Sequence, residues 1–154
     1  MQFTFTVFEK SRAIYNSYLE TLSLEELNTI PQGFNNNIIW NISHIVVTQQ
    51  ILMYKLSGLP VQIAPSLIDR YKKGTRPEQD VSQKEVDDMK ALLFETISQT
   101  QTDYNNKLFV NFQEYTVSTT GNTLQSVEDA ITFALFHEGL HLGVVKGLLN
   151  AIKL

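Results

Sequence analysis

Apolar side chains recur at steps of three and four residues along four long segments of this 154-residue chain. This period is typical of helices that bury one face, whereas a half-buried strand alternates every second residue. Turn-forming residues separate the segments, which span about 5–22, 36–57, 82–108 and, from 123 or 126, to 152. Because no clear set of strands competes with them, the pattern predicts an all-α four-helix bundle, and we expect residues 1–154 to form one domain.

Two capping boxes mark helix starts. Ser23 is followed three residues later by Glu26, and Ser82 is followed in the same way by Glu85. In a capping box the serine side chain accepts a hydrogen bond from the backbone N–H of the acidic residue, whose carboxylate accepts one from the serine N–H. The first box predicts a short extra turn after the first helix, and the second predicts the start of the third helix.

The connections between the helices differ in composition. Residues 58–80 contain three prolines and two glycines, which predicts a long connection between the second and third helices with one helical turn near 66–71. Such a connection permits an arrangement other than simple up-down neighbours. Residues 110–121 carry β-branched and aromatic side chains and predict an extended or hairpin-like segment.

Composition excludes several classes of function. Twelve basic against sixteen acidic residues give a net charge of −4, which argues against nucleic acid or an anionic membrane as a partner. With no cysteine, the chain has no disulfide, thiolate metal ligand or cysteine nucleophile of its own. The beginning of the sequence lacks the pattern of a secretion signal, and the most apolar stretch, 38–56, is too polar to span a bilayer. We therefore expect a cytoplasmic protein.

The three histidines are the strongest candidates for chemistry. His137 and His141 lie four residues apart in the last predicted helix, so both imidazoles leave the same side of it. Stepping along that helix places them on an apolar stripe with Ala134, Val144 and Leu148, and we expect both to face the core. The same stepping turns His44 of the second helix inward. Three convergent imidazoles predict a site for one divalent transition metal with open coordination positions.

Other interpretations of these residues remain open at this stage. Each histidine could instead be a hydrogen-bonded core residue. His137-Glu138-Gly139-Leu140-His141 also matches the H-E-x-x-H pattern of zinc proteases, but no third ligand follows it. A di-iron bundle would need a second E-x-x-H pattern, and Asn41 stands where its glutamate would be. Glu138 is a candidate to orient a ligand or transfer a proton, and a side chain that is solvated or pairs with another helix is an equal alternative.

Two further groups of residues have an ordinary structural interpretation. The segment from Arg70 to Arg76 holds four of the basic residues and could bind an anionic cosubstrate, although a basic loop is more often only solvated. Trp40 and Tyr54 share the stripe of His44, where aromatic residues are more often part of the core than ligand-stacking groups.

The chain resembles the DinB-like superfamily, also called the YfiT type, in two stretches. These are Ile39-Trp40-Asn41-Ile42-Ser43-His44-Ile45 and Phe136-His137-Glu138-Gly139-Leu140-His141-Leu142-Gly143. The resemblance implies a four-helix bundle with one divalent metal, nickel or zinc before iron or manganese, held by His44, His137 and His141. The family usually continues its last motif with His/Arg-Gly-Gln, whereas this chain has Leu142-Gly143-Val144.

The same resemblance implies an activity. Relatives include transferases and an isomerase that use a low-molecular-weight thiol, so the expected function is a metal-dependent thiol S-transferase with a thiol and an electrophile as its small-molecule partners. The expected assembly is a homodimer. The alternatives are a non-catalytic metal-binding bundle that senses a ligand or binds a partner, and a metal-activated hydrolase.

Overall fold

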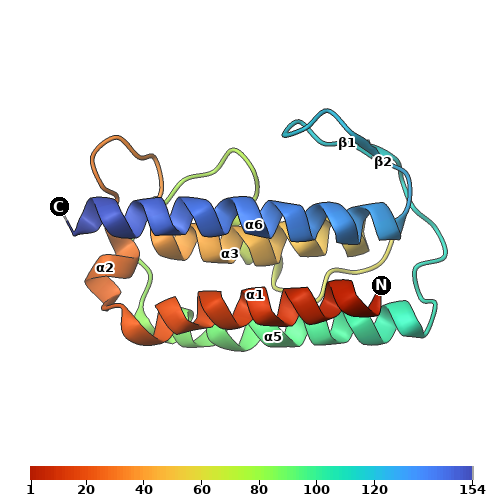
Figure 1. The fold of residues 1–154 in the computed structure, drawn as a ribbon, viewed down its shortest axis with the longest axis horizontal. Coiled ribbons are helices and arrows are strands. Elements are labelled where there is room, and N and C mark those ends of the chain that lie inside the picture. The colour runs from red at the N-terminus through yellow and green to blue at the C-terminus, as the bar shows by residue number, and fades with distance from the viewer. Residues whose placement is uncertain (154) are drawn as a thin grey trace.

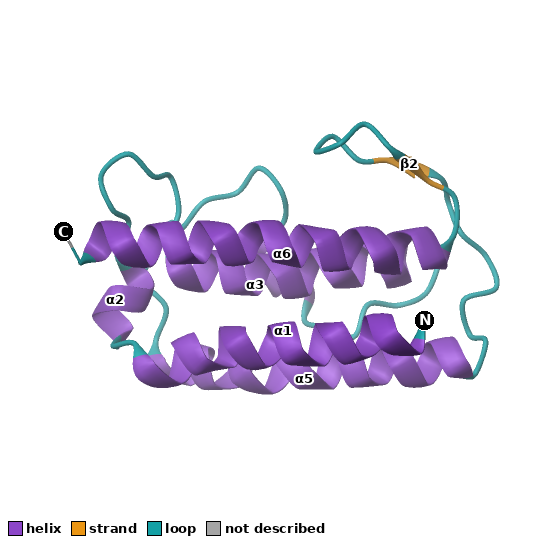
Figure 2. Cartoon of the chain, viewed as in Figure 1, coloured by secondary structure: helices purple, strands orange, loops and turns teal. Residues whose placement is uncertain are grey.

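The computed structural model describes residues 1–153, and most of them are helical (Figures 1 and 2). The prediction of an all-α bundle is confirmed. The four long helices are α1 (Gln2–Thr21), α3 (Ile38–Gln50), α5 (Gln83–Asn105) and α6 (Val127–Ile152). Between them lie α2 (Leu24–Asn28), the π-helical turn η1 (Ile51–Lys55), α4 (Pro65–Tyr71), and the strands β1 (Tyr115–Thr116) and β2 (Thr123–Leu124).

The order of the helices around the bundle differs from a simple up-down arrangement. α1 packs against α5 and α6, and α3 packs against the same two helices, so α1 and α3 lie across a diagonal. Figure 1 shows α3 and α5 running in one direction and α1 and α6 in the other. Because α3 and α5 are parallel, the chain between them must travel back along the bundle. Residues 56–82 make this crossover, and it contains the short helix α4 where the sequence predicts a helical turn.

Polar caps explain where the helices begin. Both predicted capping boxes are present, at α2 and α5. Asn37 caps α3 by accepting from the backbone N–H of Trp40 at 2.9 Å, and Ser126 caps α6 through the N–H of Asp129 at 3.2 Å. The helix predicted over 36–57 is shorter as a regular α-helix. It is α-helical from Ile38 to Gln50 and continues as the π-helical turn η1.

The buried stripe of α6 differs from the predicted one. Its members are Val127, Ala130, Ile131, Ala134, Glu138, Val145 and Leu148. His137 and His141 are half-buried beside this stripe, and Val144 is exposed. The expectation that His137 and His141 lie on the buried stripe of this helix is therefore wrong, because the stripe passes through the neighbouring residue Glu138 instead. Glu138 takes that place because a buried basic residue on α1 pairs with its carboxylate, as described below.

α3 is the central helix of the bundle. Nearly every residue from Ile38 to Gln50 is buried, because α2, α4, α5 and α6 all pack against it. The short hairpin pairs Tyr115 with Leu124 and folds over one end of α6 (Figures 1 and 2). Within residues 1–153, no helix has the length and apolar character needed to cross a membrane.

Candidate metal centre

His44, His137 and His141 converge between α3 and α6. One ring nitrogen from each can be chosen so that the three lie within 4.8 Å of one another. The ring centroids are 5.2 Å apart for His44 and His137, 4.8 Å for His44 and His141, and 4.4 Å for His137 and His141. The structure thus brings together all three histidines that the sequence singles out. Three imidazole nitrogens at this spacing can surround a single divalent ion.

Two of the rings are oriented by hydrogen bonds at Nδ1. His44 donates to the backbone carbonyl of Tyr71 at 2.6 Å, and His141 donates to Oδ1 of Asn41 at 2.8 Å. The Asn41 amide is itself fixed, because its Nδ2 donates to Asn36 Oδ1 and to the backbone carbonyl of Asn37. With Nδ1 protonated, each ring presents a lone pair at Nε2. Histidine ligands in proteins are commonly oriented in this way, by an acceptor that bonds the ring N–H not used for the metal.

Burial keeps the imidazoles neutral. It lowers the pKa of His137 to about 4, with a smaller contribution from His44. Burial likewise lowers the pKa of His141 to about 3, with His137 and His44 adding to the effect. The pKa of His44 is also lowered by burial, although its bond to the Tyr71 carbonyl acts in the opposite direction. Neutral imidazole is the form that binds metal, so the cluster is ready for an ion at pH 7.

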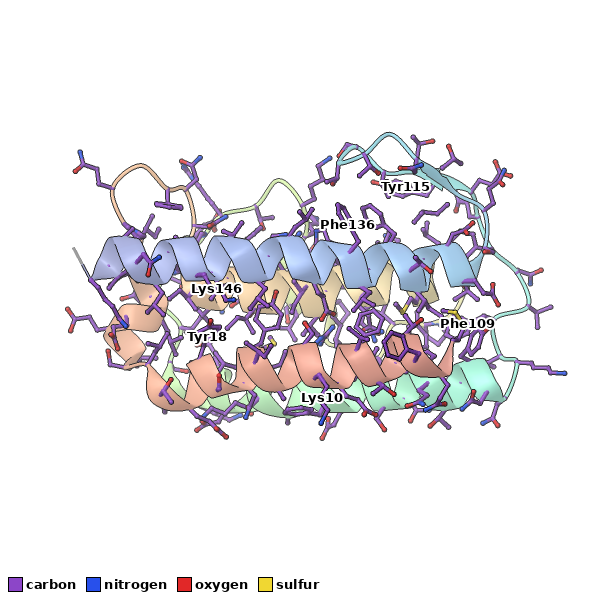
Figure 3. All side chains as sticks on the ribbon, viewed as in Figure 1. Lys10, Tyr18, Phe109, Tyr115, Phe136 and Lys146 are labelled. Atoms are coloured by element: carbon purple, nitrogen blue, oxygen red, sulfur yellow. The ribbon has the colours of Figure 1, made fainter. Side chains whose placement is uncertain are left out.

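The cluster forms one wall of a cavity of about 410 Å³. The remaining wall comes from the end of α3 and η1, from the crossover at Lys72 and Lys73, and from the hairpin. Figure 3 shows Tyr115 on the hairpin above α6, and this residue lines the cavity. A volume of this size is in the range of small-molecule sites. The histidines are therefore not sealed in the core but open to a space that a ligand can enter.

Glu138 does not line this cavity. Its Oε1 accepts from Arg12 Nη2 at 2.5 Å and from Nε at 2.9 Å, and both side chains are almost fully buried. The backbone carbonyl of Glu138 accepts from the hydroxyl of Tyr15 at 2.5 Å. Burial raises the pKa of the Glu138 carboxyl, while the guanidinium opposes that rise. This geometry supports helix pairing, the alternative to proton transfer, as the role of Glu138.

The other residues singled out in the sequence divide between the cavity and the core. Trp40 is buried and stacks on His44 with ring centroids 4.7 Å apart. It does not line the cavity, so its role is to pack against the His44 ring. Tyr54 is a core residue whose hydroxyl donates to Asp103 at 2.7 Å. In the basic segment, Arg70 pairs with Glu85, whereas Lys72 and Lys73 line the cavity.

Comparison with known families tests the resemblance seen in the sequence. A family model described as the DinB superfamily matches residues 7–145, which run from within α1 to within α6 and include all three histidines. The chain belongs to the DinB superfamily. A search of curated proteins found no match. DinB superfamily proteins are associated with metals, and the three histidines on α3 and α6 are a group that could hold a metal ion.

Sequence reasoning missed the two hydrogen-bond partners of the histidines, Tyr71 and Asn41, and the ion-pair partner of Glu138, Arg12. The carbonyl of Tyr71 belongs to the crossover, and no pattern in the sequence places it beside His44. Asn41 carried a signal that was not used, because it lies one helical turn before His44 on the same buried helix. Arg12 carried a clearer one, since it stands between Phe8 and Tyr15 on the apolar stripe of α1.

Proposed function

We propose that this chain is a divalent-metal-dependent enzyme, and specifically a transferase that uses a low-molecular-weight thiol as cosubstrate. One observation carries the proposal: three neutral imidazoles converge and open into a cavity of about 410 Å³. Structural zinc sites are closed by four protein ligands, whereas catalytic sites use three and leave a position for a ligand. An open three-histidine cluster therefore supports catalysis over a purely structural role.

In this proposal His44, His137 and His141 hold a nickel or zinc ion. Such an ion lowers the pKa of a thiol or water that it contacts, so that the nucleophile is available near neutral pH. The Tyr71 carbonyl and the Asn41 amide orient two of the imidazoles. Because the chain has no cysteine, the nucleophilic sulfur must come from the cosubstrate.

The cavity also supports the transfer step. Ile51, Leu52 and Phe133 give it an apolar wall, which excludes water from a nucleophile and strengthens electrostatic interactions. The cosubstrate sulfur forms the new bond to an electrophilic carbon. The leaving group departs with the bonding electron pair, and the thiol proton passes to solvent. A metal-activated hydrolase would use the same cavity with water in place of the thiol.

Metal content is the first test. We expect about one transition-metal ion per chain when the protein is purified without added metal or chelator and its metals are measured by mass spectrometry. His44→Ala should lose the ion. Lys146→Gln is the matched control, because Lys146 is exposed on α6 outside the cavity (Figure 3). Full metal content in His44→Ala would contradict the ligand assignment.

The loaded protein is then assayed with small thiols and electrophiles, and separately with esters. Thiol-dependent transfer that His44→Ala abolishes would support the transferase. Hydrolysis without a thiol would favour the hydrolase. A bound ion with no turnover of either kind, together with a large fall in Tm on chelation, would favour a non-catalytic metal-binding bundle.

A further inference from the structure

The cavity beside the histidines has a charge opposite to that of the whole protein. Lys72 and Lys73 line it, and among the described residues no aspartate or glutamate does. The complete chain, in contrast, has a net charge of −4. Lys72 and Lys73 are therefore the formally charged side chains of this lining. A positive cavity in an acidic protein attracts anionic ligands selectively.

The two lysines differ in how their charge is compensated. Lys72 Nζ lies 2.9 Å from Asp69 Oδ1 in an exposed pair, so part of its charge is already balanced. Lys73 Nζ donates to the Ser118 hydroxyl at the tip of the hairpin, and it forms no ion pair within residues 1–153. A hydroxyl satisfies one N–H but leaves the charge unbalanced. A carboxylate would accept the same hydrogen bond and balance the charge as well, which makes it the stronger partner.

Only part of the basic segment behaves like an ordinary solvated loop. Arg70 is directed to Glu85 on α5, away from the cavity. Lys72 and Lys73 follow directly after α4, whose last residue, Tyr71, bonds His44. The hydrogen bond that fixes His44 therefore also fixes the segment that carries the lysines. This coupling places the positive charge at a defined position relative to the histidine cluster.

We propose that Lys73, assisted by Lys72, is the anion-binding part of this cavity, and that the ligand is an organic carboxylate with an apolar body. Its carboxylate replaces the Ser118 hydroxyl as the partner of Lys73. Its apolar body lies along Ile51, Leu52 and Phe133, which line the same cavity. This proposal deepens the proposed function and rests on it in one respect, that the cavity is the substrate site.

The test uses two ligands of nearly equal shape, hexanoate and hexanamide, with the metal-free protein at pH 7.5. Binding is followed by ¹H–¹⁵N NMR at the amides of Lys73 and Ser118, so that neither metal nor activity is needed. We expect hexanoate to bind about fivefold more tightly than hexanamide. Lys73→Gln should remove this preference, Lys73→Arg should keep it, and Lys72→Gln should reduce it less because Asp69 already shares that charge. Lys146→Gln is the control and should behave as wild type.

The outcomes separate this inference from the proposed function. Equal binding of the two ligands to wild type, or the same preference in Lys73→Gln as in Lys146→Gln, would overturn it. Acetate is titrated in parallel, because it has the same carboxylate without the apolar body, and binding of acetate as tight as that of hexanoate would show that the apolar wall contributes nothing, which also contradicts the proposal. If hexanoate is preferred through Lys73 but no metal binds the histidines, the anion site stands and the metal-dependent function fails.

Discussion

The buried ion pair between Arg12 and Glu138 provides the sharpest test of how the bundle is held together. The exposed fractions of the two side chains are 0% and 1%, and Glu138 Oε1 accepts two hydrogen bonds from the guanidinium. Arg12 also donates to the Leu93 carbonyl of α5 at 3.2 Å. The pair therefore links α1, α5 and α6 through one set of charged hydrogen bonds.

Arg12→Met removes the cation and leaves the Glu138 carboxylate buried without its partner. Breaking a buried pair in this way costs about 3–5 kcal/mol of unfolding free energy. For a chain of this length, that loss corresponds to a fall in Tm of roughly 10 °C. Replacing both residues, as in Arg12→Met with Glu138→Met, removes the unpaired charge and should recover most of the stability. Urea unfolding of the metal-free proteins, followed by circular dichroism, measures each free energy.

Two controls keep this result interpretable. Lys84→Met breaks an exposed pair with Asp88 on α5 and should leave the urea midpoint nearly unchanged, because solvent screens this pair. Metal content is measured in the double variant, which should retain the ion because Glu138 does not line the cavity. The reasoning is refuted if Arg12→Met costs less than about 1 kcal/mol or if the double variant is less stable than either single variant. Loss of metal in a folded double variant would instead show that Glu138 contributes to the metal site.

Two further predictions concern the histidine cluster. Asn41→Ala removes the acceptor at His141 Nδ1 and should weaken metal affinity about 10- to 100-fold in a chelator competition assay, and unchanged affinity would contradict that role. The metal-free protein should lose stability as the pH falls from 6.5 toward 4, because His137 and His141, with pKa values of about 4 and about 3, bind fewer protons when folded than when unfolded. Urea midpoints across this range measure the slope, and the same slope in His137→Gln with His141→Gln would contradict its assignment to these residues.

The sequence predicts local features of this fold more completely than distant ones. The capping boxes at Ser23 and Ser82 are predictable because each box spans only four residues. The histidine cluster is predictable because the chain has only three histidines and two of them lie four residues apart. The ion pair joins residues 126 positions apart, and although helix pairing is one predicted alternative for Glu138, no sequence pattern identifies Arg12 as its partner. The apolar stripe of α1 indicates that Arg12 is buried, whereas the stripe predicted for α6 passes through His137 and not through Glu138. The hydrophobic period thus predicts which face is buried, but not which buried charges meet.

The cavity depends on topology, which helical periodicity does not predict. Because α3 and α5 are parallel, a long crossover must return along the bundle, and it passes beside the middle of α3, where His44 lies. The crossover contributes the Tyr71 carbonyl that orients this ligand and the lysines that give the cavity its charge. An up-down bundle with short loops would have no segment at this position. The long connection is therefore part of the candidate site, and shortening it should impair metal binding even where the four long helices still form.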